Sequence, residues 1–312
     1  MSEIIKKDPR KEFGAAVFAA AQKNPDIVAI SADSGGSSGF GDFKAAYPER
    51  YFEFGIMEQC AVGAASGLAT TGKIPVFCAI APFVTVHSLE MLRNDLGYMR
   101  QNVKIVGRNG GITYSDLGST HHSLEDFAIT RMIPDMLVLA PQDPTEIKNA
   151  VQAMIDHKGP VYMRIGNEPI PCFLPDEPFK IGKGSVLREG RDVAIIATGT
   201  QTGSVLDAVG ALTAKGIDPM VIGMATISPI DVDIIRHAAG VTGKIVTVEE
   251  HYIPGGLGSA VSEVCAEFCP VPIKMLGIPK SYASVGPYGE LMAYYGLDAA
   301  GIAASVTAFA GK

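Results

Sequence analysis

Short apolar runs alternate along the chain with longer stretches whose apolar residues recur at helical spacing, and this alternation is the strongest constraint on the fold. It predicts parallel sheets with helices packed on both faces. In the first half, we expect strands at 27–31, 51–54, 74–79, 103–107, 136–140 and 161–164, with helices at 11–23, 57–71, 84–99 and 144–157.

A proline-rich stretch interrupts this pattern. Its four prolines, at positions 169, 171, 175 and 178, and its weak helical periodicity predict a domain linker at 171–191. Beyond it, we expect strands at 193–197, 220–224, 245–248 and 273–276 and helices at 201–215, 231–239, 257–268 and 297–310. The expected fold class is therefore α/β, with two doubly wound domains at 1–170 and 192–312.

Composition narrows the possible functions. A net charge of −7 argues against nucleic acid or an anionic membrane surface as a partner, because both attract a basic face. No apolar run reaches the length of a membrane span, and the first residues lack the apolar core of a signal peptide. The five cysteines form no C-x-x-C pair and have no obvious companion ligands. We therefore expect a cytoplasmic protein with reduced thiols and no metal site of its own.

One carboxylate stands out in the segment YFEFGIMEQCAVGAASG (51–67). An apolar strand runs into Gly55, and Glu58 then opens a helix of small residues. The helix N-terminus favours a negative charge at that point. The carboxyl edge of a parallel sheet is also where open α/β sheets bind their ligands. Glu58 is therefore a candidate catalytic residue, although many helices begin with an acidic residue for stability alone.

Five further fragments follow a fixed order along the chain. They are SADSGGSSGF (31–40), GSTHHSLED (118–126), TRMIPDMLVLAPQDPTEI (130–147), VEEHYIPGGLGSAV (248–261) and YGELMAYYGL (288–297). Together with the segment around Glu58, they resemble the transketolase family over nearly the whole chain. The resemblance implies a pyrimidine-binding domain followed by a transketolase C-terminal domain, with thiamine diphosphate as the cofactor.

The resemblance also implies roles for residues around the cofactor. Glu58 matches the glutamate that hydrogen-bonds to N1′ of the aminopyrimidine and so promotes loss of the thiazolium C2 proton. Phe83 matches an aromatic residue that packs on the pyrimidine ring, and Ile80 falls where other members carry an aromatic residue. Asp33 matches an acidic residue placed near the cofactor across a dimer interface.

Substrate contacts are implied in the same way. His121 matches the histidine that hydrogen-bonds the donor ketose. Arg164 matches an arginine that binds the substrate phosphate, and Ser37 lies near another position of the phosphate site. Asn109 stands where many members have a phosphate-binding histidine. Leu117 replaces an aspartate that reads a substrate hydroxyl. These departures imply a sugar substrate other than the usual pentose and hexose phosphates, namely another phosphorylated or otherwise anionic ketose.

The residues that follow His121 predict a helix start. Ser123 and Asp126 have the S-x-x-D spacing of a capping box, in which the first side chain caps the helix. This interpretation leaves His121 free to face a substrate, because neither histidine is then needed to begin the helix.

One part of the family pattern is missing. Members of the family hold the diphosphate through a divalent metal bound by a G-D-G motif, whereas Gly41-Asp42 in this chain is followed by Phe43. The chain therefore resembles the C-terminal half of a split transketolase. An N-terminal subunit with the G-D-G motif would supply most of the site for Mg²⁺ (or Ca²⁺), and the expected assembly is an α2β2 heterotetramer. The isolated chain should be inactive.

Other interpretations remain open. The β subunit of a 2-oxo acid dehydrogenase E1 shares the two-domain plan, but that family lacks the Thr120-His121 segment and passes its product to a lipoyl carrier. A relative of deoxyxylulose-phosphate synthase is a further variant, although that enzyme is a single longer chain. A non-catalytic interaction subunit with the same fold is a third possibility. Such a degenerate copy would be expected to lose Glu58 and His121 first.

Overall fold

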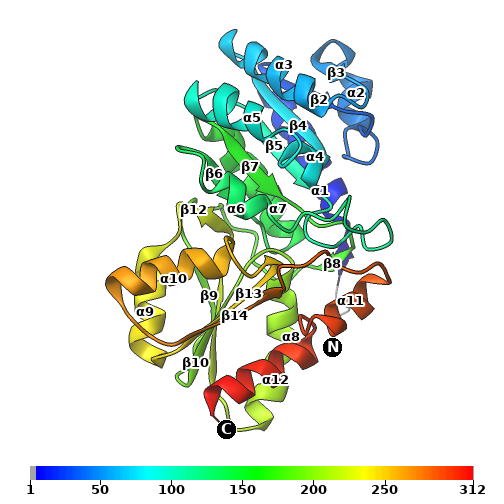
Figure 1. The fold of residues 1–312 in the computed structure, drawn as a ribbon. Helices are drawn as coiled ribbons and strands as arrows, with labels where there is room; N and C mark the ends of the chain where they lie inside the picture. The colour runs from blue at the N-terminus through cyan, green and yellow to red at the C-terminus, as the bar shows by residue number, and fades with distance from the viewer. Residues whose placement is uncertain (1–4, 312) are drawn as a thin grey trace.

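The computed structural model describes residues 5–311, which form two α/β domains (Figure 1). Residues 1–4 and 312, at the outer ends of the expected domains, lie outside the described residues. The two domains confirm the α/β class and the doubly wound plan. A short antiparallel pair, β1 (Lys6–Lys7) with β8 (Ile170–Pro171), joins the beginning of the described chain to the end of the first domain.

The first domain is built on a seven-stranded sheet in the spatial order β12-β6-β7-β5-β4-β2-β3. Its strands are β2 (Ile27–Ser31), β3 (Tyr51–Glu53), β4 (Ile74–Ile80), β5 (Lys104–Arg108), β6 (Leu137–Leu139), β7 (Val161–Arg164) and β12 (Thr226–Ser228). All neighbouring strands are parallel except β12 and β6. Burial on both faces explains why the central strands read as continuous apolar runs.

Helices cover both faces of this sheet. Helix α1 packs against α7 on one face, where Phe13 and Val151 belong to one apolar cluster with Val106 of β5. Helices α3 and η2 cover the other face. The helices of this domain are α1 (Pro9–Lys23), α2 (Gly41–Ala46), η1 (Pro48–Arg50), α3 (Glu58–Thr70), α4 (Ala81–Val84), α5 (Leu89–Met91), the π-helix η2 (Leu92–Tyr98), α6 (Asp126–Thr130) and α7 (Pro144–Asp156).

The second domain has a five-stranded sheet in the order β14-β13-β10-β11-β9, parallel except for β9. Its strands are β9 (Ser185–Arg188), β10 (Val193–Ala197), β11 (Pro219–Gly223), β13 (Ile245–Tyr252) and β14 (Ile273–Ile278). Helices α8 and α12 pack on one face, and α9 and α10 on the other. The helices are α8 (Gln201–Ala214), α9 (Val232–Thr242), α10 (Leu257–Phe268), α11 (Tyr288–Tyr294) and α12 (Ala299–Ala310).

Four strands were not expected from the sequence, namely the short pair β1 and β8 and the strands β9 and β12. The expected linker, 171–191, contains β9, which pairs with β11 at the edge of the second sheet. Its residues are only partly buried, so they lack the apolar run that marks a central strand. Strand β12 follows β11 in the chain but pairs with β6 of the first domain. A strand that follows β11 of the second domain therefore forms the edge of the first domain's sheet.

The helix expected at 84–99 is wrong, because the segment is divided into α4, α5 and η2. Two hydroxyl groups explain the break. Thr85 donates to the carbonyl of Ala81 at 2.6 Å, and Ser88 donates to that of Phe83 at 2.8 Å. Such side-chain hydrogen bonds compete with the helical backbone pattern.

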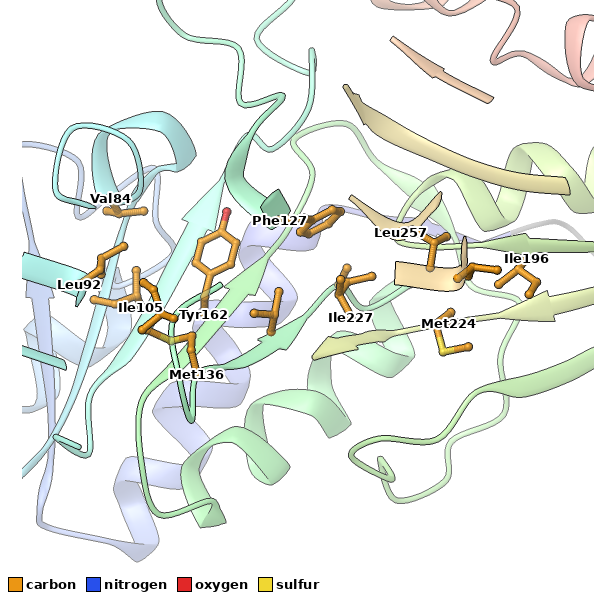
Figure 2. Packing of buried hydrophobic residues seen from close by; sticks show 14 of the residues in the cluster. Val84, Leu92, Ile105, Phe127, Met136, Tyr162, Ile196, Met224, Ile227 and Leu257 are labelled. Atoms are coloured by element: carbon orange, nitrogen blue, oxygen red, sulfur yellow. The ribbon is translucent and has the colours of Figure 1, made fainter. Parts of the chain in front are cut away.

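The largest apolar cluster runs through both domains. Figure 2 shows it passing from Val84 and Leu92 through Tyr162 and Phe127 to Leu257. Because burial of apolar surface is the main stabilising term in folding, this continuity fixes the relative position of the two domains.

Candidate active site

Glu58 lies at the beginning of α3, as expected. Gly55 has a φ of 65°, in the left-handed region that favours glycine, and this residue turns the chain from β3 toward the helix. Glu58 is the first residue of α3 and is 6% exposed. Its carboxylate accepts no hydrogen bond from any side chain or amide within residues 5–311. A nearly buried, unpartnered carboxylate at a helix N-terminus is suited to accept a hydrogen bond from a ligand.

The turn that leads into Glu58 is held by a neighbouring carboxylate. Glu53 accepts hydrogen bonds from the amides of Asp33 and Gly55 at 2.6 and 3.1 Å and from the Tyr51 hydroxyl at 2.9 Å. Asp33 is exposed and has a φ of 51°. Its amide therefore helps to fix the β2 and β3 ends side by side, while its cofactor contact stays a prediction.

Aromatic side chains gather around His121. The ring of Phe83, in α4, meets the His121 ring edge-on at 5.3 Å between centroids. The ring of Tyr114 meets the same imidazole at 5.6 Å. The Thr120 hydroxyl lies 2.9 Å from Nδ1 of His121. Phe83 and His121 are thus brought together, and Ile80 is half-buried immediately before α4.

The first turn of α3 is tied to the same region. The Gln59 amide donates to the carbonyl of His87 at 2.8 Å, and this bond links the beginning of α3 to the segment after Phe83. Ile56, Met57 and Val86 in these two segments are 77%, 56% and 45% exposed. The site is therefore bordered by apolar side chains that the described residues leave uncovered.

Asn109 lies at the end of β5 beside an arginine that the sequence did not single out. Arg108 and Asn109 are buried, and Arg108 donates to the Asn109 side-chain oxygen at 2.7 Å. The Nε of Arg108 and the Nδ2 of Asn109 have no hydrogen-bond partner in the described chain. No carboxylate in the described chain forms an ion pair with Arg108. A charged residue ending a fully buried strand is the sequence signal that could have identified Arg108.

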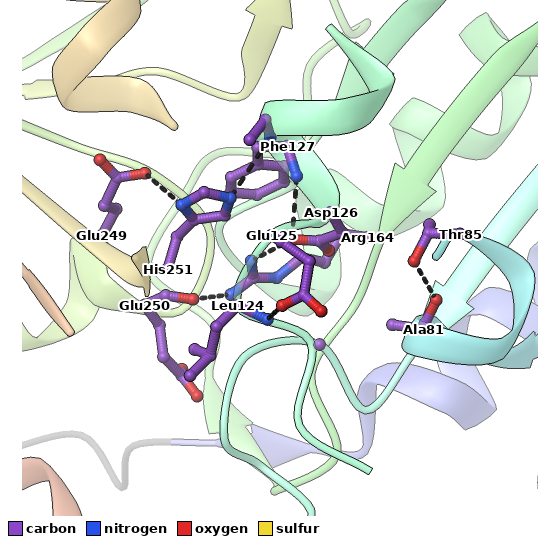
Figure 3. A network of polar contacts seen from close by, with 12 residues as sticks. Ala81, Thr85, Leu124, Glu125, Asp126, Phe127, Arg164, Glu249, Glu250 and His251 are labelled. Atoms are coloured by element: carbon purple, nitrogen blue, oxygen red, sulfur yellow. Dashed lines mark hydrogen bonds and ion pairs between the residues drawn. The ribbon is translucent and has the colours of Figure 1, made fainter. Parts of the chain in front are cut away.

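The other predicted anion-binding residues lie in different surroundings. Ser37 is exposed, and its hydroxyl donates to the carbonyl of Ser34 at 3.1 Å. Arg164 is buried and forms an ion pair with Asp126 at 3.0 Å. Its guanidinium also donates to the carbonyl of Glu250 and lies 4.4 Å from the centre of the Phe127 ring (Figure 3).

These contacts favour an interdomain role for Arg164 over the predicted phosphate contact. The cavity beside Arg164 and Phe127 has a volume of about 20 Å³. That space suits a single water molecule rather than a phosphate group. A contact between Arg164 and the substrate therefore stays a prediction that this arrangement does not favour.

The capping box expected at Ser123 and Asp126 is wrong. Helix α6 begins at Asp126 itself, with Glu125 in the capping position, and the Ser123 hydroxyl has no partner among the described residues. Asp126 is held instead by the ion pair with Arg164 and by the Tyr162 hydroxyl at 2.6 Å. The Asp126 carboxylate, which was expected to cap the helix, is therefore paired with the buried Arg164 guanidinium and the Tyr162 hydroxyl. His122 is buried nearby, and burial lowers its pKa.

Two kinds of feature are absent from residues 5–311. No helix there is both long enough and apolar enough to cross a membrane. Within the same range, no three His, Cys, Asp or Glu side chains converge in a way that could hold a metal ion.

Comparisons with known proteins cover nearly all of the chain. Residues 6–169 match the family model of the transketolase pyrimidine binding domain, and residues 182–302 match that of the transketolase C-terminal domain. One relative is the B subunit of the apulose-4-phosphate transketolase of Phocaeicola vulgatus. The two chains are 41% identical over 305 residues, and the match covers 97% of each.

Two further relatives are informative. One is the 6-deoxy-6-sulfo-D-fructose transketolase subunit SqwH of Clostridium sp. (strain MSTE9), which is 37% identical over 280 residues that cover 89% of this chain and 87% of the relative. The other is a solved structure described as a split gene transketolase, an inactive beta4 tetramer. It superposes with a TM-score of 0.88 at 39% identity, over 96% of this chain and 97% of the other.

Proposed function

Because this chain belongs to the transketolase family, we propose that it is the C-terminal subunit of a split transketolase that depends on thiamine diphosphate. The complete enzyme would transfer a two-carbon ketol unit from a ketose to an aldose. The observation that carries the proposal is Glu58, a nearly buried carboxylate that opens α3 and has no hydrogen-bond partner among the described residues.

The residues present fit the pyrimidine half of the cofactor. Glu58 offers an unpaired acceptor, Phe83 offers a half-buried aromatic ring, and Ile80 offers an aliphatic surface. Thiamine diphosphate, when bound, supplies a nucleophilic carbon that takes up the ketol unit. Glu58 would hold and return a proton at N1′ of the pyrimidine, which is general acid–base catalysis.

His121 is the proposed substrate-facing residue. Its imidazole is held edge-on by Phe83 and Tyr114 and contacts the Thr120 hydroxyl, so its orientation is restricted. An imidazole can donate a hydrogen bond to a sugar hydroxyl and exchange protons near neutral pH. His121 would thus orient the donor ketose and move a proton at its hydroxyl oxygens.

The diphosphate half of the site is assigned to a partner. The described chain offers no cluster of acidic side chains for Mg²⁺ or Ca²⁺. The exposed side chains of Ile56, Met57 and Val86 border the site and would be buried by an N-terminal subunit that carries the G-D-G motif. Two-fold symmetry makes an α2β2 heterotetramer the proposed assembly. The solved relative, an inactive tetramer of β chains, supports the proposal that this chain needs a partner for activity.

An anionic ketose is the proposed substrate class. The two relatives are named for a sugar phosphate and a sulfo-sugar, which both carry an anionic group. Arg108 is 2% exposed and has no carboxylate partner among the described residues. Because an arginine stays charged in a protein interior, this buried cation lacks an anionic partner within residues 5–311. Together with the unpaired amide of Asn109, it provides donors for such a group.

Replacing Arg108 by methionine tests this assignment. We expect kcat/KM for a ketose phosphate to fall about 10- to 100-fold, since a hydrogen bond to a charged group contributes about 1.5–3 kcal/mol. The value for the same ketose without its phosphate should change little. The control is Arg50→Met, which removes a guanidinium that donates to the carbonyls of Ala21 and Asn24. If the Arg108 variant lost kcat/KM equally for the ketose phosphate and for the ketose without its phosphate, the assignment would be contradicted.

Co-purification tests the proposed function as a whole. The tagged chain would be isolated from its native host, the accompanying proteins identified by mass spectrometry, and bound thiamine diphosphate assayed. We expect a partner with a G-D-G motif and the cofactor in the same complex. Recovery of the chain alone, with neither cofactor nor partner, would favour a non-catalytic role.

A further inference from the structure

The loop between β5 and α6 rests on the second domain. We call residues 109–123 the substrate loop, because it begins with Asn109 and carries His121. The Ser119 hydroxyl donates to the carbonyl of Ala283 at 3.0 Å, and the amide of Gly286 donates to the carbonyl of Ser115 at 3.2 Å. Ile112 is buried in the apolar core of the second domain. The loop is therefore shaped by both domains.

Glu250 of β13 makes the most buried of these contacts. Its Oε1 accepts a hydrogen bond from the amide of Ile112 at 2.6 Å. Its Oε2 accepts from the hydroxyls of Tyr288 and Thr200 at 2.9 and 3.3 Å. Burial raises the pKa of Glu250, while nearby Arg164 and these donors act in the opposite direction. One carboxylate thus connects the residue that precedes α8, helix α11 and the substrate loop.

Two glycines allow this close approach. Gly111 has a φ of 67°, and a Cβ atom there would lie 2.3 Å from Oε1 of Glu250. A Cβ atom on Gly110 would lie 2.4 Å from Nε of Arg164. Any side chain at these positions would displace Glu250 or Arg164 from the loop. The two glycines therefore leave room for Arg164 and Glu250, which come from distant parts of the chain.

The contact lies at the base of the loop, close to both of its functional ends. Gly111 and Ser123 exchange two backbone hydrogen bonds, of 3.1 and 2.8 Å, that close the loop beside Ile112. His121 is two residues from this bridge, and Asn109 is two residues from it on the other side. A shift of Ile112 would therefore move the bridge and both residues with it.

We infer that Glu250 is a positioning residue through which the C-terminal domain sets the geometry of the substrate loop. This inference rests on the proposed function for its effect on turnover, although the contact itself can be tested without activity. A displacement of about 1 Å in a catalytic site can lower the rate about 100-fold. The second domain would then influence the reaction rate at the site in the first domain.

The matched control is the neighbouring Glu249. It is buried like Glu250, and burial raises its pKa to about 7. Its carboxylate accepts hydrogen bonds from the amides of Leu257 and Gly258, both at 2.7 Å and both within its own domain. Substitution of Glu249 should therefore weaken the second domain without releasing Ile112.

Hydrogen–deuterium exchange of the full chain tests the contact directly. In Glu250→Ala, we expect amide exchange of the substrate loop to increase at least about 10-fold, because Ile112 loses its acceptor. In Glu249→Ala, exchange should increase around the start of α10 and not in the loop. Glu250→Gln keeps an oxygen for Ile112 and should restore most of the protection. Unchanged loop exchange in Glu250→Ala would overturn the inference.

Kinetics of the complex with its partner subunit then test positioning. With a ketose phosphate as donor, Glu250→Ala should raise KM about 10-fold and lower kcat about 10-fold per active site, whereas Glu249→Ala should leave KM unchanged. Glu250→Gln should recover most of both. A loosened loop with unchanged KM and kcat would overturn the positioning role. An inactive wild-type complex would contradict the proposed function instead, since the exchange result would still stand.

Discussion

Replacing Glu58 by glutamine is expected to lower turnover of the complete enzyme about 10²- to 10⁴-fold, the range usually lost with a general acid–base group. The substitution keeps the shape of the side chain but removes its ability to hold and return a proton. The fold should persist, because the Glu58 carboxylate has no hydrogen-bond partner among residues 5–311 that would lose a contact.

The measurement compares kcat, thermal stability and cofactor content of the variant and wild-type complexes. Glu90→Gln is the control, since Glu90 is an exposed carboxylate of the same domain, paired with Arg93 at 3.0 Å on the surface. It should leave kcat unchanged. Turnover of Glu58→Gln close to that of the wild type would rule out a proton-transfer role for Glu58.

Replacing Asp126 by alanine is expected to lower the free energy of unfolding by about 3–5 kcal/mol. The substitution leaves the Arg164 guanidinium buried without its carboxylate and removes the acceptor of the Tyr162 hydroxyl. In the wild type, burial lowers the pKa of Arg164, but Asp126 and Glu250 outweigh that effect and raise it. In the variant the Asp126 contribution is lost, yet a guanidinium is so basic that it stays protonated, and the cation cannot escape by losing its proton. Figure 3 shows Asp126, Arg164 and Glu250 together where the two domains meet.

Chemical denaturation measures this change, with two comparisons. Asp26→Ala breaks an exposed ion pair with Lys73, 2.9 Å long, and should change the free energy of unfolding by about 0–1 kcal/mol. The double variant Asp126→Ala, Arg164→Met removes both charges and should recover much of the loss. An equally unstable double variant would mean that packing, and not the unpaired charge, causes the effect.

The sequence predicted the elements whose signal is local. Apolar runs located the central strands, because burial on both faces requires such runs. The beginning of α3 at Glu58 was expected, because the glycine turn at Gly55 marks it. Strand β9 was missed because its residues are only partly buried, and the pairing of β12 with β6 depends on a partner far away in the chain. Long-range pairing of this kind leaves no local pattern.

The candidate site divides in the same way. Glu58, Phe83 and His121 were identified from motifs, and the structure brings Phe83 and His121 into contact. The surroundings of Arg164 could not be predicted, because Asp126 and Glu250 reach it from distant segments. Arg108 was passed over although it directly follows the expected strand at 103–107, because its lack of a carboxylate partner among the described residues is visible only once the fold is known.

Reconstitution from purified subunits tests the central claim most directly. Ketol transfer from a panel of ketose phosphates and sulfonates to aldose acceptors would be measured for this chain, for the partner with the G-D-G motif, and for their mixture with thiamine diphosphate and Mg²⁺. We predict transfer only in the mixture, with a maximum at equal amounts of the two subunits. Transfer by either subunit alone, or none in a mixture that forms a stable complex with the cofactor, would contradict the account.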